Sequence, residues 1–473
     1  MLLSFEVLDH TEAQKVHEAS LQVLSRTGMC FESDALLSGL GRMGAAVDVH
    51  RRVVRIPPAL IERTLENTRA LLASGRKLHL LNGVTSQRAV SGHIEAKMSG
   101  GCERYLDWDS QSLKPASAEE LLRCLRLGEL LPEVSFVGNP VVMKEGLDGL
   151  RVEERMRRVS TAALVAKNTR KVGSMEVWSE REIDVLVEIG IVARGSREAY
   201  DENPCLLTAK ETISPLFLDR NAGDILLALA RRGLPCTVIP MPISGMSAPA
   251  SPLGSVVLAN AEILGVMAAI QSVHPQALVG GGIISGVMDM RSGTASFSAP
   301  EAILQDIALA EVHQGLYGMD CLIGTGYTDA NYPGSRVPSE KLLKFLISFL
   351  AGHTTYPVGL LHAGSVFSAE QALVDIELCR LVHGQLACHM DTGLLGEIVN
   401  VVNEAGIRGD SLASEFTLRH FRDSWQAHLG TGDLYAAAHE RCRLLLGSRD
   451  FWEIESGKAR EIDRIVRKAE SIL

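Results

Sequence analysis

Tyrosines and charged residues follow short apolar runs in a chain that is poor in aromatic residues. Only 5% of its 473 residues are aromatic, so a group of tyrosines after such runs is informative. The face of an aromatic ring attracts a quaternary ammonium group by roughly 0.5–2 kcal/mol, so the chemistry expected here is binding of a methylated cation. The tyrosines are Tyr105, Tyr327, Tyr332 and Tyr356.

Charged and imidazole side chains at similar positions extend the candidate binding site. A carboxylate adds negative charge beside a cation, and an arginine or a histidine can hold the carboxylate at the far end of a zwitterion. The candidates are Glu211, Asp289, Asp329, Arg291, Arg336, His353 and His362. Each also has a structural interpretation, in which the acidic residues cap turns or helix starts and the aromatic rings pack inside the protein. No residue is assigned as catalytic.

Metal, thiol and phosphate chemistry are the alternatives at the same positions. The residues that could bind zinc are Cys321, His362, Cys388 and His389. Their spacing matches no local zinc motif, and neighbouring residues of a strand point to opposite faces. No cysteine stands beside an evident histidine partner for nucleophilic catalysis. Gly393 and Gly396 could offer backbone N–H groups to a phosphate, which is a weak signal.

These residues need a scaffold that brings strand ends together. Eight short apolar runs alternate with helix-like stretches, which predicts right-handed βαβ units and a parallel sheet. Eight such units predict an α/β fold, the closed (β/α)8 TIM barrel, in which strand ends share one mouth. An open doubly wound sheet is the alternative, but GNPVVMKEG follows the first run where that fold would have GxGxxG. The runs are 134–137, 171–174, 205–208, 236–239, 277–280, 321–324, 355–359 and 387–390.

Helical patterns flank this central region, and short strand-like runs precede it. Asn139, Lys144 and Glu176 also stand after predicted strands, at the expected barrel mouth. The predicted organisation is an N-terminal helical extension at 1–77, a β-rich lid or edge segment at 78–133, the barrel at 134–409 and a C-terminal helical cap at 410–473.

Composition excludes several classes of protein. The formal net charge is −10 and no lysine or arginine run is present, which argues against a nucleic-acid surface. Nine cysteines without a CxxC pair indicate a reducing compartment, and the N-terminus has no basic signal-peptide region. The longest apolar passage, 255–270, contains Asn260 and Glu262, which predicts a buried helix rather than a membrane span. We expect a cytoplasmic protein that does not bind a membrane.

Long passages of the chain resemble the trimethylamine methyltransferase family. They include PMPISGMSAPASPLGSVVLANAEILGVMAAIQ, GGIISGVMDMRSG, FSAPEAILQDIALAEVHQGLYGMD and GTGYTDANYPGSRVPSEK. The resemblance covers nearly the whole chain, from about residue 10 to about residue 445. It implies a (β/α)8 barrel with helical extensions and an enzyme of one-carbon metabolism, such as methanogenesis.

The resemblance also implies two partners for the reaction. Members of the family move a methyl group from an amine to the Co(I) of a separate corrinoid-binding protein. We therefore expect a small amine substrate, a corrinoid (cobalamin) cofactor carried by the partner protein, and no cofactor or metal bound directly. A homo-oligomer is also expected.

The loop after the sixth predicted strand bears on the substrate. The founding branch of the family carries pyrrolysine there, whereas this chain has ordinary residues from Tyr327 to Val337. It therefore resembles the branch without pyrrolysine, which acts on quaternary amines, with glycine betaine as the first candidate and Tyr332 as the suggested replacement. The alternatives are a zinc-dependent barrel methyltransferase or hydrolase and a non-catalytic barrel that binds betaine.

Overall fold

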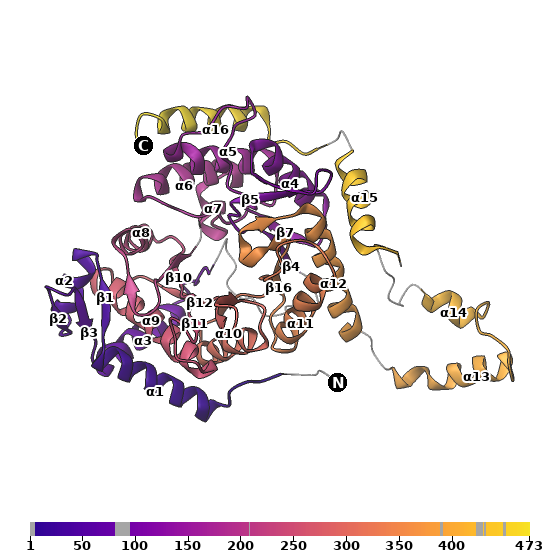
Figure 1. The fold of residues 1–473 in the computed structure, drawn as a ribbon, viewed down its shortest axis with the longest axis horizontal. Helices are drawn as coiled ribbons and strands as arrows, with labels where there is room; N and C mark the ends of the chain where they lie inside the picture. Colours follow the sequence, from indigo (N-terminus) through magenta and orange to yellow (C-terminus); the bar gives the residue numbers. More distant parts are fainter. Residues whose placement is uncertain are drawn as a thin grey trace.

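Short parallel strands surrounded by helices form the centre of a mixed α/β fold (Figure 1). The computed structural model describes residues 5–80, 95–207, 209–387, 391–421, 429, 432–447 and 451–473. Two parallel ladders are present, with the strand orders β16-β4-β7 and β15-β12-β10-β8. Their strands are β4 (Glu95–Met98), β7 (Val134–Val137), β8 (Lys210–Glu211), β10 (Thr237–Ile239), β12 (Gly280–Ile283), β15 (Cys321–Ile323) and β16 (Thr355–Pro357).

A few hydrogen bonds outside the ladders connect them through the segments that lie between them. Val172 forms a parallel bridge with the last residue of β7, and the Leu206 N–H donates to the Gly173 carbonyl oxygen at 2.9 Å. On the other side, the Thr325 hydroxyl after β15 donates to the Thr355 carbonyl oxygen in β16 at 3.1 Å. The predicted run at 171–174 therefore lies between β7 and the segment of Leu206, which leads into β8.

One predicted strand lies almost wholly outside the described residues and stays a prediction, and another strand has an unexpected place. The run at 387–390 begins at Ala387, which is the last residue of α12 (Ala369–Ala387), and its other residues lie outside the described part of the chain. Within α12, the buried residues Cys379 and Val382 stand three residues apart, as on one face of a helix. Conversely, β4 falls in the predicted lid but pairs in parallel with both β16 and β7. The domain boundaries themselves stay predictions.

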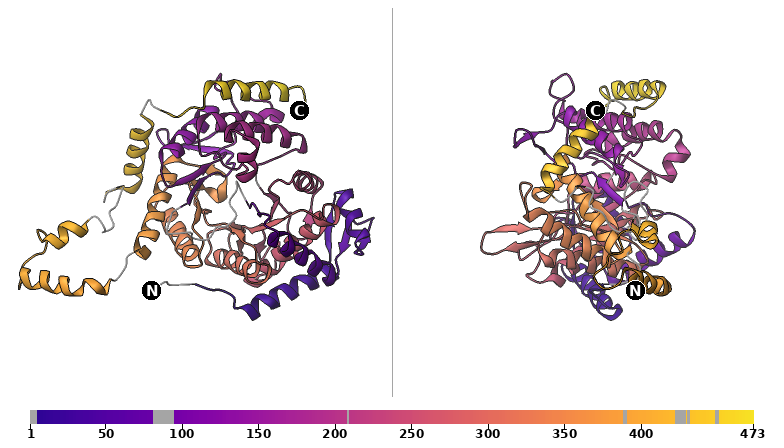
Figure 2. Two further views of the ribbon diagram at one scale, coloured as in Figure 1. Left: turned by 180° about the vertical axis from the view of Figure 1, so that it is seen from behind. Right: turned by 90° about the vertical axis from the view of Figure 1, so that its right-hand side faces the viewer.

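Helices follow the strands and cover the sheet (Figures 1 and 2). Shorter strands pair beyond the ends of the ladders, as β17-β18-β5-β6 and β11-β13-β14. The helices are α4 (Ala118–Leu130), α5 (Arg157–Asn168), α6 (Glu180–Arg194), α7 (Arg197–Glu202), α8 (Arg220–Arg231), α9 (Pro252–Val273), α10 (Pro300–Val312) and α11 (Arg336–Leu350). The outer strands are β5 (Arg104–Asp107), β6 (Ser112–Pro115), β11 (Ile243–Ser244), β13 (Gly286–Asp289), β14 (Thr294–Ser296), β17 (Leu360–Leu361) and β18 (Val366–Phe367).

The terminal segments are mainly helical. The N-terminal part has α1 (His10–Arg26), α2 (Asp34–Arg42) and α3 (Pro58–Ala73), and α1 begins at a capping box of Asp9 and Glu12. A small sheet lies beside these helices, with β1 (Met29–Phe31), β2 (Ala46–Asp48), β3 (Val53–Arg55) and the distant β9 (Phe217–Leu218). The C-terminal part has α13 (Leu395–Ala405), α14 (Glu415–His420), α15 (Leu434–Leu446) and α16 (Ser456–Ala469), and α16 packs on α5 and α6.

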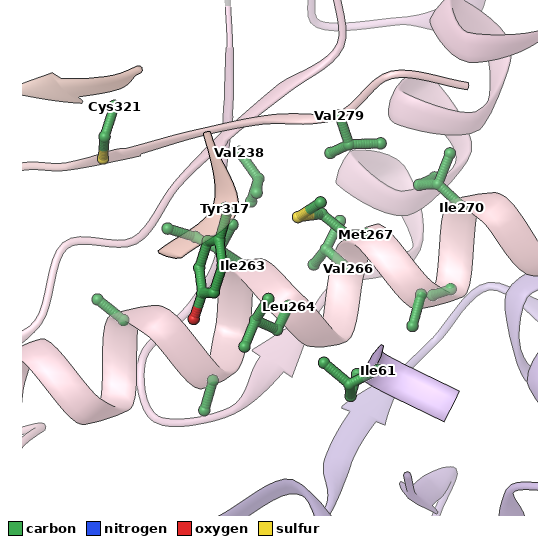
Figure 3. Packing of buried hydrophobic residues seen from close by; sticks show 14 of the residues in the cluster. Ile61, Val238, Ile263, Leu264, Val266, Met267, Ile270, Val279, Tyr317 and Cys321 are labelled. Carbon is green, nitrogen blue, oxygen red and sulfur yellow. The ribbon is translucent and has the colours of Figure 1, made fainter. Parts of the chain in front are cut away.

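Helix α9 is the centre of the larger apolar core. It is long and apolar enough to cross a membrane, but 83% of its apolar window is buried inside the protein. Figure 3 shows Ile263 and Leu264 of α9 among side chains from the N-terminal part and from the strands, including Ile61 and Val238. Its polar Asn260 donates to the Tyr317 hydroxyl at 2.9 Å. The predicted buried helix is thus confirmed.

A buried carboxylate on α10 fixes the loops after two neighbouring strands. Asp306 accepts hydrogen bonds from the Ser285 N–H after β12 and from the Gly324 N–H after β15, both at 3.0 Å. The Ser285 hydroxyl donates to the same carboxylate at 2.7 Å. Burial raises the pKa of Asp306 to about 6, against the effect of the Lys344 ammonium and of these hydrogen bonds.

Two further helices hold loops in the same way. Glu262 on α9 accepts a hydrogen bond from the Leu216 N–H at 2.8 Å and therefore fixes the loop after β8. Asp375 on α12 accepts from the Gly359 N–H after β16 at 2.8 Å and forms an ion pair with Lys341 at 2.6 Å. The loops at the carboxyl ends of the strands are thus tied to the helices behind them.

Replacement of Asp306 by alanine is expected to lower the free energy of unfolding by about 3–5 kcal/mol, because buried donors lose their acceptor. Urea denaturation measures the change. The matched control is Glu301→Ala, at an exposed position in the first turn of the same helix, for which the loss is expected to stay below about 1 kcal/mol. Equal losses for the two variants would contradict the role assigned to Asp306.

Candidate functional site

A cavity of about 160 Å³ lies at the carboxyl ends of the strands, with residues from both ladders in its wall. Most of the wall is apolar, and the few polar groups are of the kind that fix a small ligand. The apolar residues include Phe136, Met175, Ile239, Ile284, Leu322 and Leu360. The polar ones are Lys97, Ser99, Asn139, Ser174, Glu176, Glu211 and Tyr327.

Glu211 and Tyr327 give one part of the cavity an acidic and aromatic character. Glu211 ends β8, and 48% of its side chain is open to solvent. Partial burial raises the pKa of Glu211, and the carboxylates of Glu176 and Asp219 add to the effect. The Lys210 ammonium lowers it. Burial raises the pKa of Tyr327 above its ordinary range, and the carboxylates of Glu211 and Glu176 reinforce the effect. A neutral phenol ring therefore lies near negative charge.

The position of Tyr327 follows from its neighbours. The buried Lys344 ammonium donates to the Phe297 carbonyl oxygen at 2.6 Å and to the Tyr327 carbonyl oxygen at 3.5 Å. Gly364 packs against the ring with φ +84°, and a Cβ there would lie 2.8 Å from Tyr327 Cε1. Glycine is therefore required for the approach of this turn to the ring.

The negative charge of Glu176 is partly neutralised by the nearby guanidinium of Arg158. Its carboxylate accepts a hydrogen bond from Trp178 Nε1 at 2.9 Å, and Arg158 Nη2 lies 3.6 Å away. The Arg158 guanidinium also stacks 3.7 Å from the centre of the Trp178 ring. Glu211 also has a cation nearby, Lys210 Nζ at 3.9 Å, but its side chain is the more exposed of the two, which leaves it more available to a cation in the cavity.

Lys97, Asn139 and Ser174 are the buried polar residues of the wall. The Lys97 ammonium lies 5.0 Å from the centre of the Phe136 ring, and burial lowers the pKa of Lys97 to about 8, against the effect of Glu95. The Asn139 amide nitrogen has no hydrogen-bond partner within the described ranges, although the residue is 2% exposed. A buried donor of this kind can serve an acceptor on a ligand.

Of the predicted binding residues, the cavity contains Glu211 and Tyr327, and it also contains Asn139 and Glu176, which were expected at the barrel mouth. Three others, Asp289, Asp329 and His362, line a separate open hollow beside β13 and β14. In that hollow, Asp329 accepts from the Phe297 N–H at 2.7 Å and the Ser298 hydroxyl at 2.6 Å. Asp289 accepts from the Arg291 N–H at 2.9 Å, as a turn cap does.

The other predicted residues lie outside both hollows or at their edge. Tyr105 is buried in β5, and His353 is buried at the start of β16. Tyr356 packs against Phe345 with ring centres 4.7 Å apart and donates to the His353 carbonyl oxygen, so its interpretation as a packing residue fits. Arg336 lines the second hollow, whereas Arg291 and Tyr332 are exposed. A role in substrate binding for these residues stays a prediction.

Lys97 is the cavity residue that the sequence interpretation missed. Asn139 and Glu176 stand after predicted strands, but Lys97 stands inside one, in the run Glu-Ala-Lys-Met. The available signal was a lysine between two apolar residues of a strand, where an inward-facing apolar residue is usual.

Metal ligands do not cluster in the described part of the chain, where no group of three or more His, Cys, Asp or Glu side chains could hold an ion. Cys388 and His389 of the predicted zinc set lie outside the described residues. Cys321 is buried, and burial raises the pKa of its thiol well above the ordinary range.

Comparison with known proteins shows the family to which the chain belongs. Residues 2–434 match the family model described as Trimethylamine methyltransferase (MTTB). The chain therefore belongs to the trimethylamine methyltransferase family, which confirms the resemblance seen in its sequence. The resemblance rests on long motifs rather than on any single residue.

Individual relatives are distant but match over most of their length. Trimethylamine methyltransferase MttB of Desulfitobacterium hafniense (strain DSM 10664 / DCB-2) is 24% identical over 88% of this chain and 82% of its own. MttB of Methanosarcina barkeri (strain Fusaro / DSM 804) is 24% identical over 97% and 94%. The glycine betaine methyltransferase of Desulfitobacterium hafniense (strain Y51) is 25% identical over 92% and 88%. The crystal structure of Methanosarcina barkeri monomethylamine methyltransferase (MtmB) matches with a TM-score of 0.49 and 11% identity, over 99% and 90%.

Binding of the simple cation tetramethylammonium is expected to strengthen as the pH rises through the raised pKa of Glu211, because the carboxylate then gains its charge. Replacement by Gln should remove this pH dependence and weaken binding about fivefold, as for a partly exposed ion pair. Isothermal titration calorimetry measures both effects, with the exposed Glu66→Gln as the control. An unchanged pH profile in Glu211→Gln would contradict the assignment.

Proposed function

We propose that the protein transfers a methyl group from a quaternary amine, with glycine betaine as the first candidate, to the Co(I) of a separate corrinoid protein. Membership of the methyltransferase family supports the reaction class. The single observation that supports a cationic substrate is the cavity wall in which Glu211 and Tyr327 lie near one another. The similarity to a glycine betaine methyltransferase is equal in extent to that with trimethylamine methyltransferases.

We infer that the two ladders close into an eight-stranded barrel. In this arrangement β4 is the first strand and β7 the second, the segment at Val172 is the third, and the segment at Leu206 leads into β8 as the fourth. The parallel pairing of β16 with β4 supports closure, because it joins strands 260 residues apart. The cavity then lies at the mouth, where a barrel of this class has its site.

The cavity residues suit methyl transfer by orientation. The C–N bond breaks with its electron pair kept by nitrogen, and cobalt supplies the pair for the new bond to the methyl group. A quaternary ammonium leaves as a neutral tertiary amine, so no acid is needed. Glu211 and the Tyr327 ring would hold the cation, and the apolar walls at Phe136 and Ile239 would exclude water. Fixing the reacting groups in line supplies much of the rate gain.

The corrinoid is treated as the second substrate and belongs to the partner protein. A partner must bring its cobalt to the carboxyl ends of the strands, because the cavity opens there. The outer strands β13 and β14 flank this side and carry the exposed Met290 next to them. A transient interface on this side of the sheet follows from the geometry of the reaction.

The purified protein is expected to methylate the Co(I) form of a corrinoid with glycine betaine as donor, measured by absorbance under anaerobic conditions. Replacement of Tyr327 by leucine should raise KM for the amine about 2- to 30-fold, the range of a cation–π contact. Tyr332→Leu is the matched comparison on the same loop, at an exposed site.

Two outcomes would change this account. Absence of methyl transfer from every quaternary amine tested would reject the proposed reaction, and tight betaine binding in that case would favour a non-catalytic binding protein. A loss of activity in Tyr332→Leu without any effect of Tyr327→Leu would move the site to the exposed loop.

A further inference from the structure

Lys97 occupies an unusual position for a lysine. It is the third residue of β4, in parallel register with Phe136 of β7 and with Pro357 of β16. Strands therefore lie on both sides of it, and the residue is only 5% exposed. Its side chain forms part of the cavity wall together with those two neighbours.

The ammonium group of Lys97 has no compensating anion in contact with it. Within the described residues, neither a hydrogen bond nor an ion pair joins this group to another side chain or to a carbonyl oxygen. Other buried lysines of the fold are paired: Lys341 with Asp375, and Lys344 with the Phe297 carbonyl oxygen. The Phe136 ring offers Lys97 only a cation–π contact, which is weak compared with an ion pair.

An unpaired buried ammonium is costly for the fold. The penalty for taking an ion out of water is large, and a single ring contact does not offset it. The lowered pKa of Lys97 reflects the same burial, opposed by Glu95 on its own strand. A group kept at such a cost inside a binding cavity suits a ligand that brings the missing negative charge.

The acidic groups of the cavity do not supply the negative charge that Lys97 lacks. Glu211 is influenced by Lys210, Glu176 and Asp219, and the charge that acts on Lys97 is that of Glu95. The strands explain this separation, because β4 pairs with β16 and β7 whereas β8 pairs with β10 in the other ladder. The cavity thus has a negative part at Glu211 and a positive part at Lys97.

We propose that the Lys97 ammonium binds the carboxylate of a zwitterionic quaternary amine whose cationic end lies at Glu211 and Tyr327. This inference rests on the proposed function and adds to it the residue that selects betaine-type substrates over simple methylamines. Arg291, Arg336 and the histidines suggested by the sequence lie away from this cavity, and Lys97 takes the role considered for them.

The test compares three probes by calorimetry on the full-length protein. Glycine betaine has both charges, tetramethylammonium lacks the carboxylate, and 3,3-dimethylbutanoate replaces the trimethylammonium group by an uncharged tert-butyl group. Lys97→Met should weaken binding of glycine betaine and of 3,3-dimethylbutanoate by about 10- to 100-fold, the range for a charged hydrogen bond. Tetramethylammonium should bind no more weakly than before, which also shows that the variant is folded. Lys15→Met, at an exposed position of α1, is the matched control.

The pH dependence of the wild-type protein gives a second readout that needs no variant. Affinity for glycine betaine should fall as the pH rises above about 8, because Lys97 loses its proton. The other ionisable groups that face the cavity are Glu176, Glu211 and Tyr327, and Glu95 lies on the same strand. Tetramethylammonium provides the comparison, since loss of the Lys97 charge should not weaken the binding of this probe.

Each result decides between the inference and its alternatives. Equal weakening of all three probes in Lys97→Met, or unchanged binding of glycine betaine, would overturn the role of Lys97. Methyl transfer from tetramethylammonium by a protein that does not bind glycine betaine would also overturn it, while the proposed reaction class would stand. Lys97-dependent betaine binding without any methyl transfer would support the inference and reject the proposed reaction.

Discussion

Buried carboxylates on the helices are the constraint on which the mouth of this protein depends. Asp306, Glu262 and Asp375 each accept backbone N–H groups from loops that follow parallel strands. The hydrogen bonds that such a buried carboxylate accepts are strong only while all of their donors stay in place. The helices therefore fix the loops, and the loops fix Glu211 and Tyr327 around a small apolar cavity. Specificity in such a site comes from a few charges in defined positions rather than from the size of the cavity.

Much of the scaffold could be predicted from the sequence because the strands are short apolar runs with helical patterns between them. The runs at 134–137, 236–239, 321–324 and 355–359 contain β7, β10, β15 and β16. The predicted run at 387–390 overlaps the described structure only at Ala387, the last residue of α12, so it stays a prediction. The place of β4 could not be predicted, since its partner β16 lies 260 residues away and pairing between distant strands leaves no local signal.

Only some residues of the candidate site could be predicted from the sequence, for a related reason. Tyr327 and Glu211 follow strands, and position alone was enough to select them. Tyr105 and Tyr356 have the same residue type but pack in the interior, a difference that depends on neighbours from other strands. Lys97 was overlooked because a lysine inside a strand usually faces solvent. Its importance appears only when β7 and β16 are seen on either side of it.

The central claim is that one cavity recognises both ends of a zwitterionic quaternary amine. The most direct measurement is a crystal structure of the protein with glycine betaine bound. The account predicts the trimethylammonium group beside the Glu211 carboxylate and the Tyr327 ring, with the betaine carboxylate in hydrogen-bond contact with Lys97 Nζ. Betaine bound in the hollow of Asp329 and His362, or with its carboxylate remote from Lys97, would contradict it.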